Sequence, residues 1–122
     1  MSEQALEELH VISSPHVAGY RELTATAAAP KLGRFRLIDV REPAEYVGPL
    51  GHLAGAELVP LATVLLAAST WNRAEPILLI CRSGKRSGTA AAALAERGFT
   101  ELYNLVGGML DWNHCGLALE SP

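Results

Sequence analysis

The sequence has few of the features that mark a disulfide-rich, nucleic-acid-binding or membrane protein. Its 122 residues include two cysteines, too few for a disulfide scaffold. Ten lysines and arginines stand against thirteen aspartates and glutamates, a net charge of −3, and the chain has no basic run. Nucleic acids and anionic membrane surfaces are bound by clustered positive charge, so the sequence argues against both as partners.

Signals for membrane insertion, export and metal binding are also missing. No apolar run approaches the about 18 residues that span a bilayer. Residues 1–10 are polar and acidic, whereas a signal peptide begins with positive charge and continues with an apolar segment. We therefore expect a cytoplasmic protein whose cysteines stay reduced. We expect no metal and no organic cofactor, because neither cysteine has metal-ligand spacing to any of the four histidines: His10, His16, His52 and His114.

The length and the regular spacing of proline and glycine indicate one domain over residues 11–119. No linker rich in serine, glycine or charge divides it, and a core of this size needs no disulfide or metal to be stable. Residues 1–10 are expected to form an N-terminal extension, in which Leu6 and Leu9 among acidic residues favour a short frayed or docked helix. Residues 120–122 are expected to form a C-terminal tail.

Short apolar runs that alternate with stretches of helical composition predict an α/β fold. We expect strands at 36–40, 57–60, 77–80 and 102–106, and 11–13 could add a fifth at an edge. We expect helices at 16–29, 61–71 and 87–97, the first with Ser14 and Pro15 at its start. This alternation favours a mostly parallel sheet with helices on both faces. The run ILLI at 77–80 is apolar throughout, as a strand covered on both faces must be, and should lie centrally.

The segment CRSGKRS at 81–87 follows this central strand directly and leads into a helix. Parallel sheets bind ligands beyond the carboxyl ends of their strands, and a helix N-terminus offers free N–H groups to an anion. Three cations in this segment surround the thiol of Cys81 and should lower its pKa, making a thiolate nucleophile available at neutral pH. An inert, buried cysteine is the alternative. The clustered cations favour catalysis or anion capture, because they repel one another unless they share an anion.

Four blocks of sequence, in this order, resemble those of single-domain rhodaneses: LIDVREPAEY at 37–46, GHLAGAELVP at 51–60, CRSGKRS at 81–87 and GGMLDW at 107–112. The resemblance covers residues 13–119. It implies a mostly parallel five-stranded sheet with helices on both faces. It also implies transfer of a sulfane sulfur through a cysteine persulfide, from thiosulfate or a persulfide donor to cyanide or a thiol acceptor, which can belong to a protein partner.

The same resemblance implies roles for individual residues. Cys81 would accept the sulfur, and cations of the loop would attract the anionic donor. Asp39 and Arg41 match an Asp-x-Arg pair of the family and would form an ion pair that shapes the site, unless their role is purely structural. The backbone amides of the loop would form a cradle for the substrate; its residues are Arg82, Ser83, Gly84, Lys85, Arg86 and Ser87.

Other positions leave alternatives open. His52 is either a general base or, as we favour, a hydrogen-bonded turn residue, and Trp112 is expected to pack a helix onto the sheet. Residues 47–50 are four where the family commonly has two, so the loop at the pocket mouth is expected to be longer. Cys115 has no counterpart in the family's motifs and is either a resolving thiol or, as we favour, a structural or surface thiol.

Two further functions compete with sulfur transfer. Phosphatases and arsenate reductases of the same architecture have an arginine six positions after the cysteine, where this chain has Ser87 and carries Arg86 one place early. The shorter loop fits a sulfur atom better than a phosphoryl group. A persulfide relay or a binding module dedicated to a protein partner is the second alternative, and the presence of Cys81 argues against a pure binding module.

Overall fold

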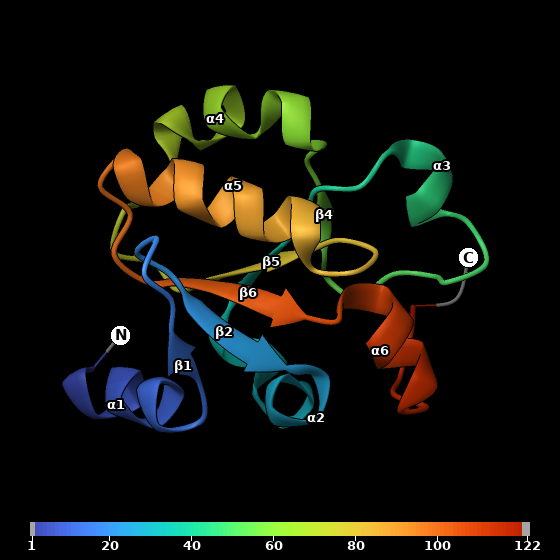
Figure 1. Ribbon diagram of the computed structural model, residues 1–122, viewed down its shortest axis with the longest axis horizontal. Coiled ribbons are helices and arrows are strands. Elements are labelled where there is room, and N and C mark those ends of the chain that lie inside the picture. Colours follow the sequence, from blue (N-terminus) through green and yellow to red (C-terminus); the bar gives the residue numbers. More distant parts are fainter. Residues whose placement is uncertain (1, 121–122) are drawn as a thin grey trace.

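The computed structural model describes residues 2–120 and contains one six-stranded sheet (Figure 1). The strands lie in the order β1-β2-β6-β5-β3-β4, and β1 and β2 are the antiparallel pair in an otherwise parallel sheet. The α/β class is therefore confirmed, with six strands in place of five. The bounds are Ser14–Pro15 (β1), Arg21–Thr24 (β2), Arg36–Asp39 (β3), Glu57–Leu58 (β4), Ile77–Ile80 (β5) and Leu102–Val106 (β6).

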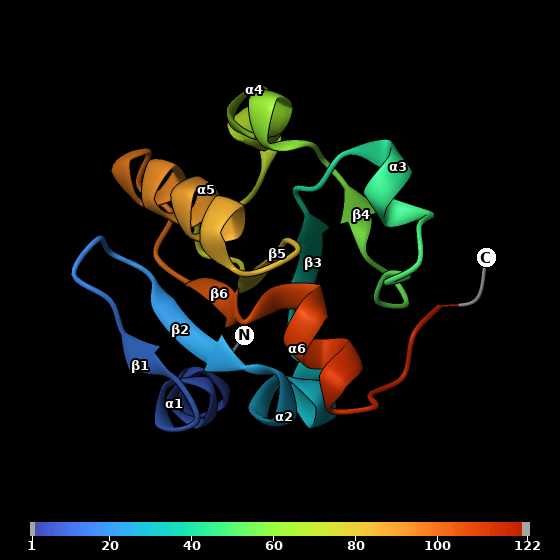
Figure 2. The same ribbon diagram turned by 45° about the vertical axis from the view of Figure 1, so that its right-hand side comes forward.

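Helices cover both faces of the sheet (Figure 2). Leu78 and Ile80 belong to the core on the face of α1, α2 and α6, whereas Ile77 and Leu79 belong to the core on the face of α4 and α5. The helix bounds are Glu3–Val11 (α1), Ala25–Ala28 (α2), Pro43–Tyr46 (α3), Val64–Ala67 (α4), Lys85–Glu96 (α5) and Gly108–His114 (α6), with 3-10 turns at Ala29–Arg34 (η1), Leu61–Thr63 (η2) and Ala68–Thr70 (η3).

The strand β5 lies at the centre of the sheet, as predicted. It pairs with β6 on one side and with β3 on the other, and all four of its side chains are fully buried. An apolar side chain at every position is what a strand covered on both faces requires. The carboxyl end of β5 therefore opens at the middle of the sheet edge, where Cys81 follows.

The helix predicted over residues 16–29 is wrong, because only Ala25–Ala28 is α-helical there. Residues 21–24 instead form β2, which pairs in parallel with β6 from Arg21 opposite Tyr103 to Thr24 opposite Val106. Leu23 is buried in the core as a result. Pairing the backbone of β6 and burying Leu23 outweigh the weak helical preference of the segment, since tertiary contacts routinely override local propensity.

The N-terminal part of the chain also corrects the expectation. α1 extends to Val11, so residues 11–13 form no strand, and Ser14 and Pro15 lie in the edge strand β1 rather than at a helix start. The predicted N-terminal helix is present and docked, because Leu9 is fully buried against the sheet.

The two remaining predicted helices are present with different bounds. The helix expected at 61–71 is divided into η2, α4 and η3, and the helix expected at 87–97 begins at Lys85. No helix within residues 2–120 is long and apolar enough to cross a membrane.

Candidate active site

Cys81 follows the last residue of β5, and its side chain is fully buried. The chain then curls through residues 82–84 into α5. Gly84 makes this curl with a left-handed φ of +95° and lies so close to its neighbours that a Cβ would come within 3.1 Å of the Leu105 carbonyl oxygen. The left-handed conformation favours glycine at this position, and a side chain here would also push the Leu105 carbonyl by a few tenths of an ångström.

Two hydrogen bonds converge on the sulfur of Cys81. The Gly84 amide donates to Sγ at 3.1 Å and the Ser87 hydroxyl lies within donating distance at 3.3 Å. Burial, the largest single influence, raises the pKa of the thiol. Together, the hydrogen bonds from Ser87 and from the amides of Gly84 and Ser83 lower the pKa by more than burial raises it, so the pKa of Cys81 is below the ordinary value. The direction agrees with our expectation, but the cause is hydrogen bonding rather than the nearby cations.

A third residue holds this arrangement from the neighbouring strand. Asn104, in β6, accepts a hydrogen bond from Ser87 Oγ at 2.5 Å and donates from Nδ2 to the Gly84 carbonyl at 3.1 Å and to Glu22 Oε2 at 3.0 Å. Asn104 was not predicted from the sequence. The available signal was a buried-strand pattern, LYNLV, interrupted by one amide.

The start of α6 closes the other side of the loop. The amides of Met109 and Leu110 donate to the carbonyls of Cys81 and Arg82 at 2.9 and 3.0 Å. A Cβ on Gly108 would overlap both carbonyls, so this close approach needs glycine. Trp112 is buried in the core on this face, as expected.

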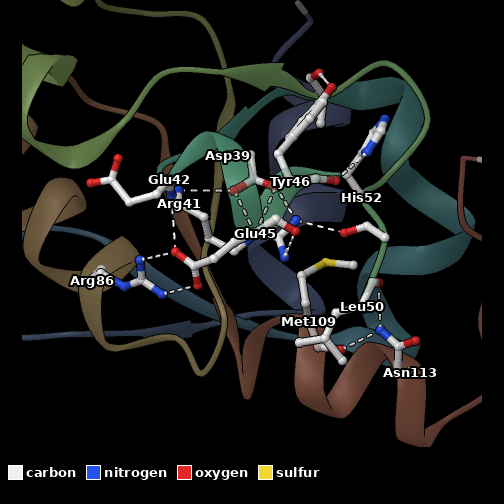
Figure 3. Close-up of polar contacts among 12 residues, drawn as sticks. Asp39, Arg41, Glu42, Glu45, Tyr46, Leu50, His52, Arg86, Met109 and Asn113 are labelled. Atoms are coloured by element: carbon white, nitrogen blue, oxygen red, sulfur yellow. Dashed lines mark hydrogen bonds and ion pairs between the residues drawn. The ribbon is translucent and has the colours of Figure 1, made fainter. Parts of the chain in front are cut away.

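The three cations of the loop have different environments. Arg86 forms two hydrogen bonds with the carboxylate of Glu45, at 2.7 and 2.8 Å (Figure 3). The Arg86 hydrogen bond is the largest influence on the pKa of Glu45 and helps hold it at about 2. Arg86 is therefore largely neutralised, while Arg82 and Lys85 are exposed. Within residues 2–120 neither of these two has a carboxylate at ion-pair distance.

Asp39 and Arg41 form a fully buried ion pair with an N–O distance of 2.8 Å. The same guanidinium also donates to the carbonyls of Glu45 and Gly51, at 3.2 and 2.7 Å (Figure 3). The pair thus connects the carboxyl end of β3 to α3 and to the loop that follows it. It holds the backbone of Glu45 in place, and within residues 2–120 it forms no hydrogen bond with Cys81.

His52 has the contacts of a turn residue. Its Nδ1 lies 2.9 Å from the Tyr46 carbonyl oxygen and its ring stacks on that of Tyr46 at a centroid distance of 3.7 Å.

Cys115 is exposed at the end of α6, about 10 Å along the axis from Gly108 at the usual helical rise. In residues 2–120 no cluster of histidine, cysteine, aspartate or glutamate could hold a metal ion.

A pocket of about 290 Å³ adjoins the Cys81 loop and is lined by Arg41, Glu45, Pro49, Leu50 and Arg82. The loop at 47–50 supplies two of its five lining residues. A larger cavity, of about 550 Å³, includes Arg36 and Pro76 at the amino ends of β3 and β5, the edge of the sheet opposite Cys81.

The family model for the rhodanese-like domain matches residues 21–115. The chain belongs to this family. The rhodanese fold is also that of a solved rhodanese-related protein from Thermoplasma volcanium, which is 25% identical and superposes with a TM-score of 0.73 over 81% of this chain and 96% of that one.

Two relatives have names that state an activity. The chain is 34% identical over 82% of its length to the putative sulfur carrier protein YrkF of Bacillus subtilis, of which the match covers 55%. It is 30% identical over 63% of its length to the thiosulfate sulfurtransferase GlpE of Pseudomonas paraeruginosa, of which the match covers 68%. The chain thus spans about half the length of the first of these relatives and about two thirds of the second.

Proposed function

We propose that this rhodanese-like protein is a sulfurtransferase that carries a sulfane sulfur as a persulfide on Cys81. One observation supports this most directly: the Cys81 sulfur accepts hydrogen bonds from the Gly84 amide and the Ser87 hydroxyl at the N-terminus of α5. These donors stabilise negative charge on sulfur, which both a thiolate and a persulfide anion carry. The names of the relatives YrkF and GlpE point to the same chemistry.

In the first half-reaction the Cys81 thiolate attacks the outer sulfur of thiosulfate or of a persulfide donor. A bond forms between Sγ and the outer sulfur, and the bond from the outer sulfur to the rest of the donor breaks with its electron pair. Sulfite or a thiolate leaves, and the enzyme keeps a persulfide anion.

In the second half-reaction cyanide or a thiol attacks the outer sulfur of the persulfide. The bond to Sγ breaks and the thiolate of Cys81 is restored, with thiocyanate or a new persulfide released. The exposed Arg82 and Lys85 attract anionic donors to the loop. The scheme is a double displacement and predicts ping-pong kinetics. It suits a reducing compartment such as the cytoplasm, where thiols persist.

The site fits the competing functions less well. A phosphatase needs a free guanidinium facing the cysteine, but the side chain facing Sγ here is the Ser87 hydroxyl, and Arg86 is held by Glu45. A sulfur relay to a protein partner uses the same persulfide, and YrkF is named a putative sulfur carrier. Fast turnover of thiosulfate and cyanide supports a freestanding enzyme, whereas slow turnover with stable persulfide loading supports the relay.

Mass spectrometry of intact protein and peptides, without reductant, tests the proposal. Incubation with thiosulfate should add one sulfur atom to the Cys81 peptide, and cyanide should remove it with release of thiocyanate. The variant Cys81→Ser should take up no sulfur, and Cys115→Ser, which removes the exposed thiol, is the matched control that should load normally. Loading that persists in Cys81→Ser would disprove the assignment of the nucleophile.

A further inference from the structure

The carboxylate of Glu22 reaches the site through Asn104. Glu22 lies in β2 opposite Asn104 in β6, and the two strands lie side by side next to α5 (Figure 1). Glu22 Oε2 accepts a hydrogen bond from Asn104 Nδ2 at 3.0 Å. Within residues 2–120 no lysine, arginine or histidine lies at ion-pair distance from Glu22. Its carboxylate is therefore held by an amide and not by a cation.

The contacts of the Asn104 amide decide which way it faces. Its nitrogen lies 3.1 Å from the Gly84 carbonyl oxygen and 3.0 Å from the carboxylate of Glu22, and both of these oxygens accept hydrogen bonds. Both amide protons are therefore used, and Oδ1 faces the Ser87 hydroxyl at 2.5 Å. A reversed amide would place Oδ1 against two acceptors and leave their hydrogen bonds unmade, which is unfavourable.

Asn104 in this orientation holds both residues that donate to the sulfur of Cys81. The Gly84 amide lies 3.1 Å from Sγ, and the Ser87 hydroxyl lies 3.3 Å from it. Asn104 binds the first residue through its carbonyl and the second through its hydroxyl. The hydrogen bond of Glu22 goes to Asn104, so Glu22 acts on the sulfur through the amide.

The amide has little room to rearrange. Asn104 is buried, and a Cβ on Gly88 of α5 would lie 3.4 Å from its nitrogen and 3.2 Å from the hydroxyl oxygen of Tyr20. Without Glu22, one buried N–H of the amide would lack an acceptor. A buried donor without a partner is unfavourable, so the amide would turn toward water and weaken its contacts with Gly84 and Ser87.

From these contacts we propose that Glu22 is a positioning residue for the reaction at Cys81. It fixes the Asn104 amide so that Gly84 and Ser87 present their donors to the sulfur, in the thiolate and in the persulfide that follows. The inference rests on the proposed sulfurtransferase function and adds to it a residue that does not touch the reacting atoms.

The charge of Glu22 has an effect of its own that must be separated from positioning. Tyr20 lies near Glu22, and its pKa is raised first by burial and then by the negative charge of Glu22. The same charge disfavours a thiolate, so removing it lowers the pKa of a nearby thiol. Loss of positioning raises that pKa, because the donors to the sulfur are no longer held. The two effects therefore have opposite signs at Cys81.

Two substitutions separate the hydrogen bond from the charge. Glu22→Met removes both, whereas Glu22→Gln removes the charge and keeps an oxygen that accepts from Asn104. In Glu22→Met, alkylation of Cys81 by iodoacetamide at pH 7 should become at least about threefold slower, which corresponds to a rise of about half a unit in pKa. Glu22→Gln should not be slowed. Glu96→Met, the same change at the exposed far end of α5, is the matched control and should leave the rate unchanged.

The outcomes of this comparison are distinct. The proposal is overturned if the two Glu22 variants change the rate equally, in either direction, or if Glu22→Met leaves it unchanged. A role in stability alone would lower the Tm of Glu22→Met and leave the pH–rate profile of Cys81 in place. If Glu22→Met does not fold, Glu22→Thr serves the same comparison, because a β-branched residue suits a strand and its hydroxyl lies two carbon atoms nearer to the backbone.

NMR gives a direct readout of the amide. Both side-chain protons of Asn104 should exchange slowly with water in the unmodified protein and in Glu22→Gln, and at least one should exchange faster in Glu22→Met. Unchanged exchange in Glu22→Met would mean that Glu22 does not hold the amide.

Alkylation needs no sulfur donor, so it separates failure of this inference from failure of the proposed function. A slower alkylation in Glu22→Met, with no persulfide formed from thiosulfate by the unmodified protein, keeps the positioning role and rejects the sulfurtransferase function. Normal persulfide formation, with the same alkylation profile in Glu22→Met and the unmodified protein, rejects the positioning role alone.

Discussion

The hydroxyl oxygen of Ser87 lies 3.3 Å from the sulfur of Cys81. The same oxygen lies 2.5 Å from Asn104 Oδ1, yet a hydroxyl has one proton to donate. When Cys81 is a thiol, the Ser87 hydroxyl can donate its proton in a hydrogen bond to Asn104 Oδ1. When Cys81 is a thiolate, the charged sulfur is the stronger acceptor. The ionisation of Cys81 is thereby coupled to the position of Asn104 in the neighbouring strand.

Replacing Ser87 by alanine should raise the pKa of Cys81 and slow its reaction at neutral pH. A hydrogen bond to a charged group contributes about 1.5 kcal/mol or more, so alkylation by iodoacetamide at pH 7 should become about tenfold slower. In the pH–rate profile, the rise of the rate with pH should move to higher pH, because less thiolate is present at each pH. Thr89→Ala, on an exposed position of α5, is the control. An unshifted profile in Ser87→Ala would show that the hydroxyl does not stabilise the thiolate.

Asn104→Asp should weaken the site because it removes both hydrogen bonds that Asn104 donates. A carboxylate can accept from Ser87, but it cannot donate to the Gly84 carbonyl or to Glu22. We expect a loss of about 1–3 kcal/mol in the free energy of unfolding, from urea titration, and a higher pKa of Cys81 from the alkylation profile. Adding Glu22→Gln should restore part of both, because an amide can donate to the new carboxylate. A double variant that loses as much stability as the two single variants together would contradict this.

The residues of the site were predictable from the sequence to the extent that their roles are local. Cys81 and its glycine-containing loop form one continuous segment between a buried strand and a helix. Asn104 was missed because its partners are 17, 20 and 82 residues away, and nothing in a single sequence links them. The pairing of Arg86 with Glu45, 41 residues apart, escaped prediction for the same reason, so Arg86 was expected to be available to the donor.

Lys85→Ala should raise the KM for thiosulfate at low salt. Lys85 is exposed at the start of α5 and supplies long-range attraction rather than a fixed contact. We expect an increase of roughly twofold to fivefold at low ionic strength that shrinks near 0.5 M salt, because the screening length falls to a few ångströms at about 1 M. Lys31→Ala removes a lysine from η1 rather than from the Cys81 loop. It changes the net charge by the same amount as Lys85→Ala and should leave KM unchanged. Equal increases in both variants would assign the effect to net charge instead of to the loop.

Glu45→Gln should destabilise the protein at neutral pH and have no effect in strong acid. The folded-state pKa of Glu45 is about 2, below its ordinary value of 4.5. A carboxylate with a lowered pKa contributes stability above its unfolded pKa, and this contribution is lost as the pH falls from about 4.5 to about 2. The pair is partly exposed to solvent, so we expect at most about 1 kcal/mol, or roughly 4 °C in Tm. Thermal unfolding of both proteins at pH 7, 4 and 2.5 should show that the difference in Tm shrinks as the pH falls. A Tm difference that stays constant would contradict the assignment of this stability to the Glu45 carboxylate.

The fold was predictable where the residues of an element are buried on both faces. The strands β5 and β6 have the bounds expected from their apolar runs, because few other structures could bury such runs completely. β2 was missed because only Leu23 of its four residues is buried. Its strand conformation depends on pairing with β6, a partner about 80 residues away in sequence. A strand with so little burial of its own is set by pairing and not by its own composition.

Gly108→Ala should damage both the fold and the site, because Gly108 lies against the backbone of the Cys81 loop. Its φ is +55°, and a Cβ would overlap the carbonyls of Cys81 and Arg82. Gly116→Ala is a close control, since Gly116 has a φ of +67° but open space around it. The control should cost only the strain of the left-handed conformation, about 1–2 kcal/mol, measured by urea unfolding. Gly108→Ala should cost clearly more and should also slow persulfide formation by displacing the carbonyl of Cys81. Equal costs in the two variants would mean that α6 can move away from the loop without loss.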